Sequence, residues 1–136
     1  MSKRARLFFI LAAAGVAVAA AILLLRETPG DADRRAFEKL VGRWMRLDGG
    51  YVIEIRGVDA DGKMDVAYLN PRPINVAQAK ASREGGTTKV FVELRDKGYP
   101  GSTYTLSHDP QRHNLRGIYF QAALGQRFDV LFVRSP

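Results

Sequence analysis

Apolar and polar residues alternate along short segments that begin near residue 43 and continue to the end of the chain. The clearest example is YVIEIR at residues 51–56, in which every second residue is a tyrosine or an isoleucine. This period of two is typical of a strand with one buried face. The Asp48-Gly49-Gly50 run before it favours a tight turn, because glycine readily adopts the positive φ angles of short hairpins. Residues 41–56 therefore predict a strand, a hairpin turn and a second strand.

Turn-forming residues punctuate the rest of the chain and divide residues 42–135 into eight short segments. The expected segments are 43–48, 51–58, 63–70, 74–83, 87–95, 102–108, 114–122 and 126–134. Regular strands with tight connections predict an all-β, antiparallel up-and-down meander, and closure of eight strands into a barrel leaves no exposed sheet edge. An open sandwich of two sheets is the alternative. The alanine-rich segment 74–83 is also compatible with a helical turn over residues 75–80.

The N-terminal part of the chain has a different pattern, because residues 7–25 form an apolar run without a charged residue. This length suits a membrane-spanning helix better than the shorter core of a cleaved signal peptide, which is the alternative. The cationic side chains of Lys3, Arg4 and Arg6 are expected to stay in the cytoplasm. We therefore predict a transmembrane signal anchor over residues 1–26. In a bacterial cell, which we assume, the protein is then a single-pass inner-membrane protein whose C-terminal domain faces the periplasm.

Residues 27–41 are expected to form a linker and a short helix. The Pro29-Gly30 pair interrupts a helix that arrives from the N-terminal side, and either of the two aspartates that follow can cap a new one. The apolar side chains of Phe37, Leu40 and Val41 share one side of this helix. We expect the helix to plug one end of the domain that follows.

Composition narrows the classes of function. The chain has no cysteine, which excludes disulfides, thiolate catalysis and cysteine-based zinc sites. The net charge of +7 would ordinarily indicate an anionic partner. Several of the basic residues, however, flank the apolar run at residues 7–25, and the remainder of the chain has a mixed charge. We therefore predict a mixed-charge surface and no nucleic-acid partner.

The tripeptide Gly42-Arg43-Trp44 follows the expected short helix and opens the predicted meander. In this arrangement residues 42–136 resemble the lipocalin and avidin-like (calycin) barrels, whose first strand characteristically begins with Gly-x-Trp. The resemblance implies an eight-stranded up-and-down barrel in which the tryptophan closes one end against an arginine of the last strand. Arg134 stands at the matching position. Eight strands enclose an interior just large enough for side chains or one small ligand.

Candidate residues for catalysis or metal binding are few. His108 and His113 flank the Asp109-Pro110 turn, where they can approach each other as metal ligands, but an exposed turn favours the same residue types. Residues 59–65 have a faint calcium-loop pattern without the terminal glutamate, so a hairpin turn is the better interpretation. No serine lies in a nucleophile motif. We expect no enzyme activity, no catalytic residue, no metal and no cofactor.

Aromatic and amide side chains on the strands form the candidate ligand site. Tyrosine combines an apolar ring with a hydroxyl, a combination that suits small-ligand pockets and protein contact surfaces alike. Glu93 and Arg95 belong to the site only if their strand face points inward, and Val90, Val92 and Leu94 compete for that interior. The candidate ligand-binding residues are Tyr68, Asn70, Glu93, Arg95, Tyr104, Tyr119 and Gln121.

Two functions from different classes follow from these expectations. In the first, the protein is a membrane-anchored periplasmic lipocalin-like barrel that binds a small, partly apolar ligand at its open end. In the second, it is a packed barrel that serves as a protein-interaction or assembly module of an envelope complex. The expected partners are the inner membrane and either the small ligand or an envelope protein.

Overall fold

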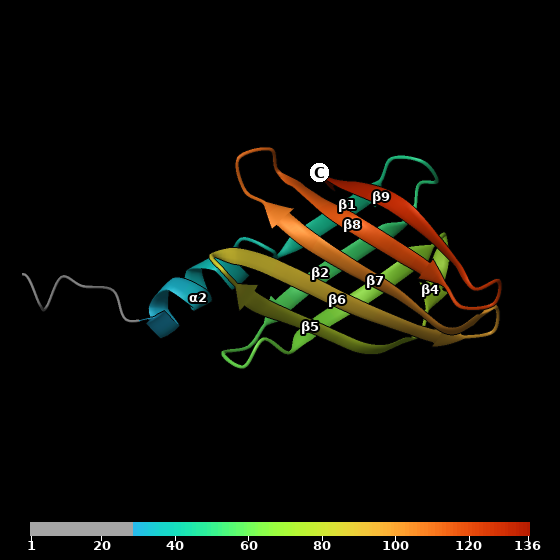
Figure 1. Cartoon of the computed structure of the whole chain (residues 1–136), viewed down its shortest axis with the longest axis horizontal. Coiled ribbons are helices and arrows are strands. Elements are labelled where there is room, and N and C mark those ends of the chain that lie inside the picture. The colour runs from blue at the N-terminus through green and yellow to red at the C-terminus, as the bar shows by residue number, and fades with distance from the viewer. Residues whose placement is uncertain (1–28) are drawn as a thin grey trace, which may run out of the picture. The chain divides into compact units, whose positions relative to one another are not determined.

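The computed structural model describes residues 29–136, which form one helix and nine strands (Figure 1). The elements are α2 (Pro29–Glu38), β1 (Gly42–Arg46), β2 (Val52–Val58), β3 (Met64–Asn70), β4 (Arg72–Ile74), β5 (Val76–Glu84), β6 (Thr87–Asp96), β7 (Tyr99–Asp109), β8 (Asn114–Gln121) and β9 (Gln126–Ser135). The expected membrane anchor over residues 1–26 lies outside the described residues. Within residues 29–136, no helix combines the length and the hydropathy that crossing a bilayer requires.

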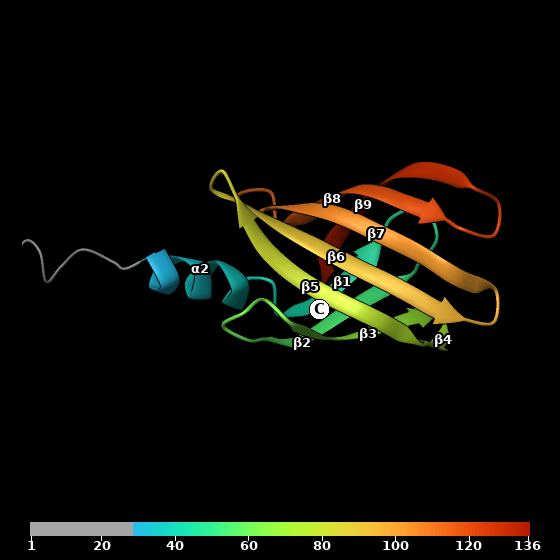
Figure 2. The same cartoon turned by 60° about the horizontal axis from the view of Figure 1, so that its bottom comes forward.

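The nine strands form one antiparallel sheet in the order β4-β3-β2-β1-β9-β8-β7-β6-β5. The first strand pairs with the last, with Trp44 opposite Arg134, so the meander returns to its beginning. The two edges of the sheet meet where a single bridge joins Lys63 to Lys80 and the amide of Ala81 donates to the carbonyl of Gly62 at 2.6 Å. The sheet is therefore a nearly closed barrel with a seam between β3 and β5, and the sandwich alternative is wrong (Figures 1 and 2).

The strand count differs by one from the expected eight. Arg72 and Pro73, which lie between the expected segments 63–70 and 74–83, form the short strand β4 together with Ile74, and this strand pairs with the end of β3. Pro73 is tolerated there because β4 is an edge strand, where a residue without an N–H costs no ladder hydrogen bond. The alanine-rich segment is the strand β5 and not a helical turn. The other strands begin and end within a few residues of the expected bounds.

Helix α2 begins at Pro29, earlier than the interrupting role of the Pro29-Gly30 pair predicts. A proline in the first helical turn is tolerated, because the N–H that it lacks would have no intrahelical acceptor. After the helix, Leu40 is fully buried, and Phe37 in its last turn is 6% exposed. Both belong to the core of the barrel, as expected, whereas Val41 is 41% exposed and does not.

Trp44 occupies the barrel end at which Phe37 and Leu40 lie, which we call the α2 end. Its indole Nε1 donates to the carbonyl of Leu40 at 2.8 Å, and the guanidinium of Arg134 lies 4.3 Å from its ring centroid. This is the tryptophan–arginine contact that the calycin resemblance implies. Gly42 has a φ of 140°, and a Cβ on it would collide with Nη1 of Arg134, which explains the glycine of the Gly-x-Trp motif.

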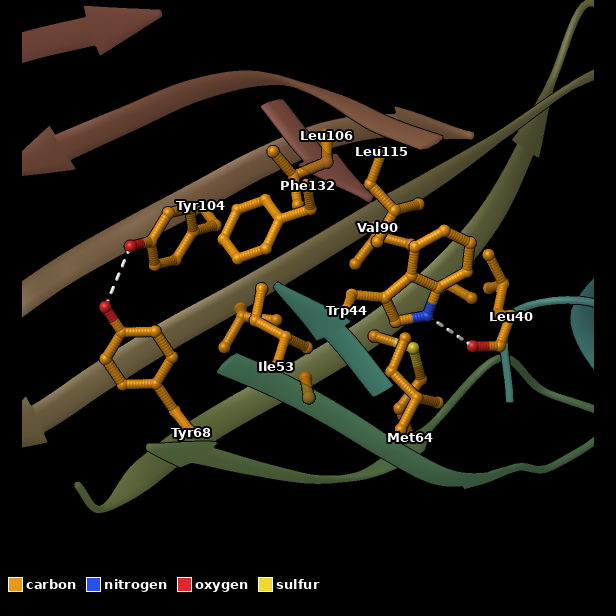
Figure 3. Packing of buried hydrophobic residues seen from close by; sticks show 14 of the residues in the cluster. Leu40, Trp44, Ile53, Met64, Tyr68, Val90, Tyr104, Leu106, Leu115 and Phe132 are labelled. Carbon is orange, nitrogen blue, oxygen red and sulfur yellow. Dashed lines mark hydrogen bonds between the residues drawn. The ribbon is translucent and has the colours of Figure 1, made fainter. Parts of the chain in front are cut away.

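Large side chains fill the middle of the barrel between the two ends. Trp44, Tyr68, Tyr104 and Phe132 are among the largest side chains that are fully buried. Figure 3 shows these side chains across the interior, with Trp44 beside Leu40 at one side, the two tyrosines at the other and Phe132 between them. The core therefore separates the α2 end from the opposite, tyrosine-lined end, which we call the open end.

Candidate functional site

All five tyrosines of the chain lie in one group at the open end. We call the group Tyr51, Tyr68, Tyr99, Tyr104 and Tyr119 the tyrosine cluster. The ring centroids of Tyr104 and Tyr119 are 4.6 Å apart, and that of Tyr68 lies 5.6 Å from Tyr104. These separations fall in the range in which aromatic pairs attract each other beyond simple burial. The cluster is therefore one packed aromatic surface and not a set of isolated residues.

Strand alternation and register bring these rings together. Along β7, the inward residues are Ser102, Tyr104, Leu106 and His108, so that Tyr104 faces the interior. Tyr119 of β8 is the direct cross-strand partner of Tyr104, which places both rings on the same face of the sheet. The close contact between the rings of Tyr104 and Tyr119 therefore follows from their pairing across β7 and β8.

Arg46 is a buried cation inside the tyrosine cluster. It follows Trp44 by two residues on β1 and therefore shares its inward face. The guanidinium carbon lies 4.8 Å from the ring centroid of Tyr51 and 5.3 Å from that of Tyr119, so that the charge lies over two aromatic faces. The guanidinium donates through Nε and Nη2 to the two carboxylate oxygens of Asp48, the second at 2.9 Å.

The ion pair fixes the charges at this end of the barrel. Burial lowers the pKa of Arg46, but the hydrogen bonds to Asp48 and Tyr104 outweigh it, and the net shift is upward. The hydrogen bond from Arg46 lowers the pKa of Asp48. The guanidinium and the carboxylate are therefore both charged at neutral pH, and a compensated ion pair stands beside the aromatic rings.

The hydroxyls of Tyr104 and Tyr68 extend a chain of hydrogen bonds that begins at Arg46. Arg46 Nη1 donates to the hydroxyl oxygen of Tyr104 at 3.1 Å, since a guanidinium has no acceptor atom. The hydroxyl of Tyr68 lies 2.9 Å from the same oxygen. Tyr104 is fully buried and Tyr68 is 1% exposed, so the two hydroxyls are hydrogen-bonded to each other away from water, and either oxygen can be the acceptor. Arg46, Tyr104 and Tyr68 therefore form one buried hydrogen-bonded chain.

Both hydroxyls remain protonated at physiological pH. Burial raises the pKa of Tyr104 to about 12, in spite of the opposing hydrogen bonds with Tyr68 and Arg46. Burial also raises the pKa of Tyr68, and its interaction with Tyr104 adds to the shift. The chain from Arg46 through Tyr104 to Tyr68 is therefore a hydrogen-bond relay of two neutral hydroxyls that begins at a fixed positive charge.

A pocket of about 360 Å³ opens beside this relay. Its lining residues are Arg46, Tyr51, Tyr68, Asn70, Gly98, Tyr99, Tyr119, Gln121 and Phe128. The amide Nδ2 of Asn70 donates to the hydroxyl of Tyr99, which leaves the proton of that hydroxyl for a further acceptor. The wall of the pocket thus combines ring faces with hydroxyl and amide groups, and we call it the mouth pocket.

The structure brings most of the candidate ligand-binding residues to this pocket. Tyr68, Asn70, Tyr119 and Gln121 line it, and Tyr104 lies directly behind Tyr68 in the hydrogen-bond relay. The sequence analysis chose these positions as aromatic and amide residues on the strands, without information on their contacts.

Glu93 and Arg95 are not part of the site. Val90, Val92 and Leu94 of β6 are fully buried, so the alternate residues of the same strand point outward. The side chain of Arg95 is 62% exposed and lies 3.3 Å from the carboxylate of Glu93 in a surface ion pair. The inward interpretation of this pair is therefore wrong, because the valine and leucine side chains occupy the interior.

Five lining residues escaped the sequence analysis, namely Arg46, Tyr51, Gly98, Tyr99 and Phe128. The period of two contained a signal for the first two, since Arg46 alternates with Trp44 and Tyr51 alternates with Ile53. For Tyr99 no such signal existed, because the glycine- and proline-rich residues 96–101 predict a loop. The strand β7 begins at Tyr99 and carries it to the rim.

The other candidate positions have structural roles. His108 is 8% exposed, and its ring meets that of Trp44 edge to face at a centroid distance of 5.6 Å, so the expectation of an exposed turn is wrong for this histidine. His113 adopts a positive φ of 51° in the β7–β8 turn. In the calcium-like segment, Asp59 Oδ1 accepts the amides of Asp61 and Lys63, as in an ordinary hairpin turn.

Comparison with known proteins adds no identity to this geometry. No family model, no curated protein and no solved structure matches the chain. The functional interpretation therefore rests on the mouth pocket and on the chemistry of its described residues.

Proposed function

We propose that this protein is a lipocalin-like barrel that binds a small, partly apolar ligand in the mouth pocket. The observation that carries the proposal is the convergence of ring faces with hydroxyl, amide and guanidinium groups around one concave volume of about 360 Å³. This volume lies near the lower end of the range typical of small-molecule sites, about 300–1,000 Å³. A packed structural core has no need for so many polar groups, because each buried polar group costs free energy unless it is paired.

The rings and the donors divide the ligand into two parts. The faces of Tyr51, Tyr119 and Phe128 offer contact to an apolar or aromatic portion. The hydroxyl of Tyr99 accepts from Asn70 and keeps its own proton for an oxygen or nitrogen acceptor of the ligand. Because Asp48 already balances the charge of Arg46, the acceptor can be a neutral carbonyl or hydroxyl oxygen.

The proposal is tested by a thermal-shift screen on the full-length protein in non-ionic detergent, against small phenols, aromatic acids and short-chain lipids. We expect a subset with an apolar body and an oxygen acceptor to raise the unfolding temperature. Gln121→Ala removes one amide from the pocket rim and should weaken the best compound about tenfold, the effect of one buried hydrogen bond. Arg95→Gln is the control on the outer face and should leave the affinity unchanged. A screen without stabilising compounds, or equal affinity loss in both variants, contradicts the proposal.

The proposed location is the periplasm, with the chain tethered to the inner membrane by the apolar run within residues 1–26. The support is the length of this run together with the cationic residues before it. Protease added to spheroplasts should digest the barrel, whereas intact cells should protect it. Recovery of the protein in the cytosolic fraction contradicts the location without affecting the ligand site.

A second candidate function, the protein-interaction module of an envelope complex, is favoured by an apolar patch on the outer face of the barrel. Met45 of β1 is paired with Val133 of β9, and the amide of Leu47 donates to the carbonyl of Leu131. These side chains alternate with inward residues, and Leu47 is 61% exposed. Cross-linking in intact cells should yield an adduct with another envelope protein that Leu47→Ser abolishes. Recovery of monomer alone argues against this function.

A further inference from the structure

A second pocket, of about 470 Å³, lies at the α2 end of the barrel, where Trp44 and Leu40 close the interior. Its lining residues are Lys39, His108, Pro110, His113 and Arg134, and we call it the basic pocket. Apart from the proline, each of these side chains carries a positive charge or can accept a proton. Within the described part of the chain, no carboxylate lines this pocket.

Arg134 is held in place by neutral partners. Its Nη1 donates to the carbonyl of Val41 at 2.8 Å, and its Nη2 donates to the carbonyl of Lys39. Its guanidinium also stacks on Trp44. These contacts fix the orientation of the side chain without neutralising its charge, so little conformational entropy remains to be lost when an anion binds.

The other basic side chains of the pocket lower the pKa of the buried His108 ring. The pKa of His108 is lowered first by burial and next by the charge of Arg134, and Lys39 and His113 shift it in the same direction. The Asp109 carboxylate opposes them. It is engaged by its own turn, because its Oδ1 accepts the amides of the two residues that follow Pro110. The basic pocket is therefore lined by two cations, Lys39 and Arg134, together with both histidine rings.

We propose that the basic pocket binds an oxyanion of the phosphate type. A tetrahedral oxyanion presents several acceptor oxygens at once, which matches a concave site lined by ammonium, guanidinium and imidazole donors. The site is distinct from the mouth pocket, since the core with Phe132 and Tyr104 lies between the two ends (Figure 3). A free phosphate and the phosphate of a lipid headgroup share the chemistry that the pocket recognises.

The two histidines of the chain both line the basic pocket, which makes their ring protons a specific probe of it. Inorganic phosphate is added at constant pH to the full-length protein in non-ionic detergent, and the histidine ring signals are followed by proton NMR. We expect both signals to shift until the site is saturated. Sodium chloride at the same ionic strength should not produce this shift. Histidine signals that do not move with phosphate, or that move equally with chloride, overturn the proposal.

Charge removal at matched positions tests where the anion binds. Lys39→Gln takes one exposed cation from the basic pocket and should weaken phosphate binding about fivefold, because an exposed ionic contact is worth little more. Lys97→Gln makes the same change in the exposed turn between β6 and β7, beside the mouth pocket, and should leave the affinity unchanged. Equal affinities in the two variants overturn the assignment.

The source of the phosphate is identified with soluble lipids. Dihexanoyl-phosphatidylglycerol is added in place of phosphate, with zwitterionic dihexanoyl-phosphatidylcholine as the control. Histidine shifts that appear with the phosphatidylglycerol but not with the phosphatidylcholine, and that Lys39→Gln weakens, identify an anionic headgroup as the ligand. Shifts with inorganic phosphate and none with either lipid identify a free phosphate compound.

Discussion

Replacing Tyr104 by phenylalanine tests the hydrogen-bond relay that organises the open end. The substitution keeps the ring and its packing and removes a single oxygen atom. That oxygen accepts from Arg46 at 3.1 Å and lies 2.9 Å from the hydroxyl of Tyr68. Tyr104 is fully buried and Tyr68 is 1% exposed, so water is poorly placed to replace the lost partner.

The expected cost follows from the two groups left behind. A buried donor or acceptor without a partner costs about 1–3 kcal/mol. Tyr68 should contribute near the middle of this range. Arg46 should contribute near its lower end, because its side chain is 10% exposed and keeps both bonds to Asp48. We therefore expect Tyr104→Phe to lower the free energy of unfolding by about 2–4 kcal/mol.

The measurement is urea unfolding of the full-length protein in non-ionic detergent, followed by the fluorescence of Trp44, the one tryptophan of the chain. Tyr51→Phe is the matched control, since the structure gives the hydroxyl of Tyr51 no hydrogen bond within residues 29–136. It should change the free energy of unfolding by less than about 0.5 kcal/mol. The same small change in Tyr104→Phe, with an unaltered dependence on urea, would refute the relay.

Three further predictions concern single residues. Asp48→Asn should destabilise the protein at neutral pH. Because the Arg46 bond lowers the folded-state pKa of Asp48, the stability difference between this variant and the wild type should vanish as the pH falls through that pKa. Equal stability of the two proteins at every pH would contradict the prediction. The stability of the wild type should fall between about pH 7 and pH 5, because the folded-state pKa of His108 is lowered and the unfolded chain binds the proton more readily. His108→Gln should make this fall smaller, and an unchanged dependence of stability on pH would contradict the prediction. Gly42→Ala should cost about 1–3 kcal/mol through the positive φ and contact with Arg134, measurable by urea unfolding, and wild-type stability would contradict it.

Much of the fold could be predicted from the sequence because the domain is built from local signals. Alternation and turn residues located the strands to within a few residues, and the Gly-x-Trp motif anticipated the contact of Trp44 with Arg134. The strand β4 was missed because prolines flank Arg72, and a proline signals a turn unless the strand is known to lie at a sheet edge. Edge position is a property of the assembled sheet and leaves no local trace.

The candidate site was predictable where a single strand decides which way a residue points. Tyr68 and Tyr119 were found in this way, and the same rule, applied with Trp44 as reference, also gives Arg46. The ion pair with Asp48 was not predictable, because an aspartate before two glycines is already explained as a turn residue. The outward orientation of Glu93 depends on Val92 and Leu94 filling the interior, which only the closed barrel decides.

The most direct test of ligand binding uses the fact that every tyrosine of the chain belongs to the tyrosine cluster, whereas both histidines and the tryptophan lie at the α2 end. Full-length protein with carbon-13 in its tyrosine rings is titrated with the best compound of the thermal-shift screen, and its ring spectrum is recorded by NMR. We predict saturable shifts of tyrosine signals, strongest for those that line the mouth pocket, while the histidine and tryptophan signals stay in place. Binding that moves the histidine and tryptophan signals and leaves the tyrosines unchanged would contradict the assignment of the site.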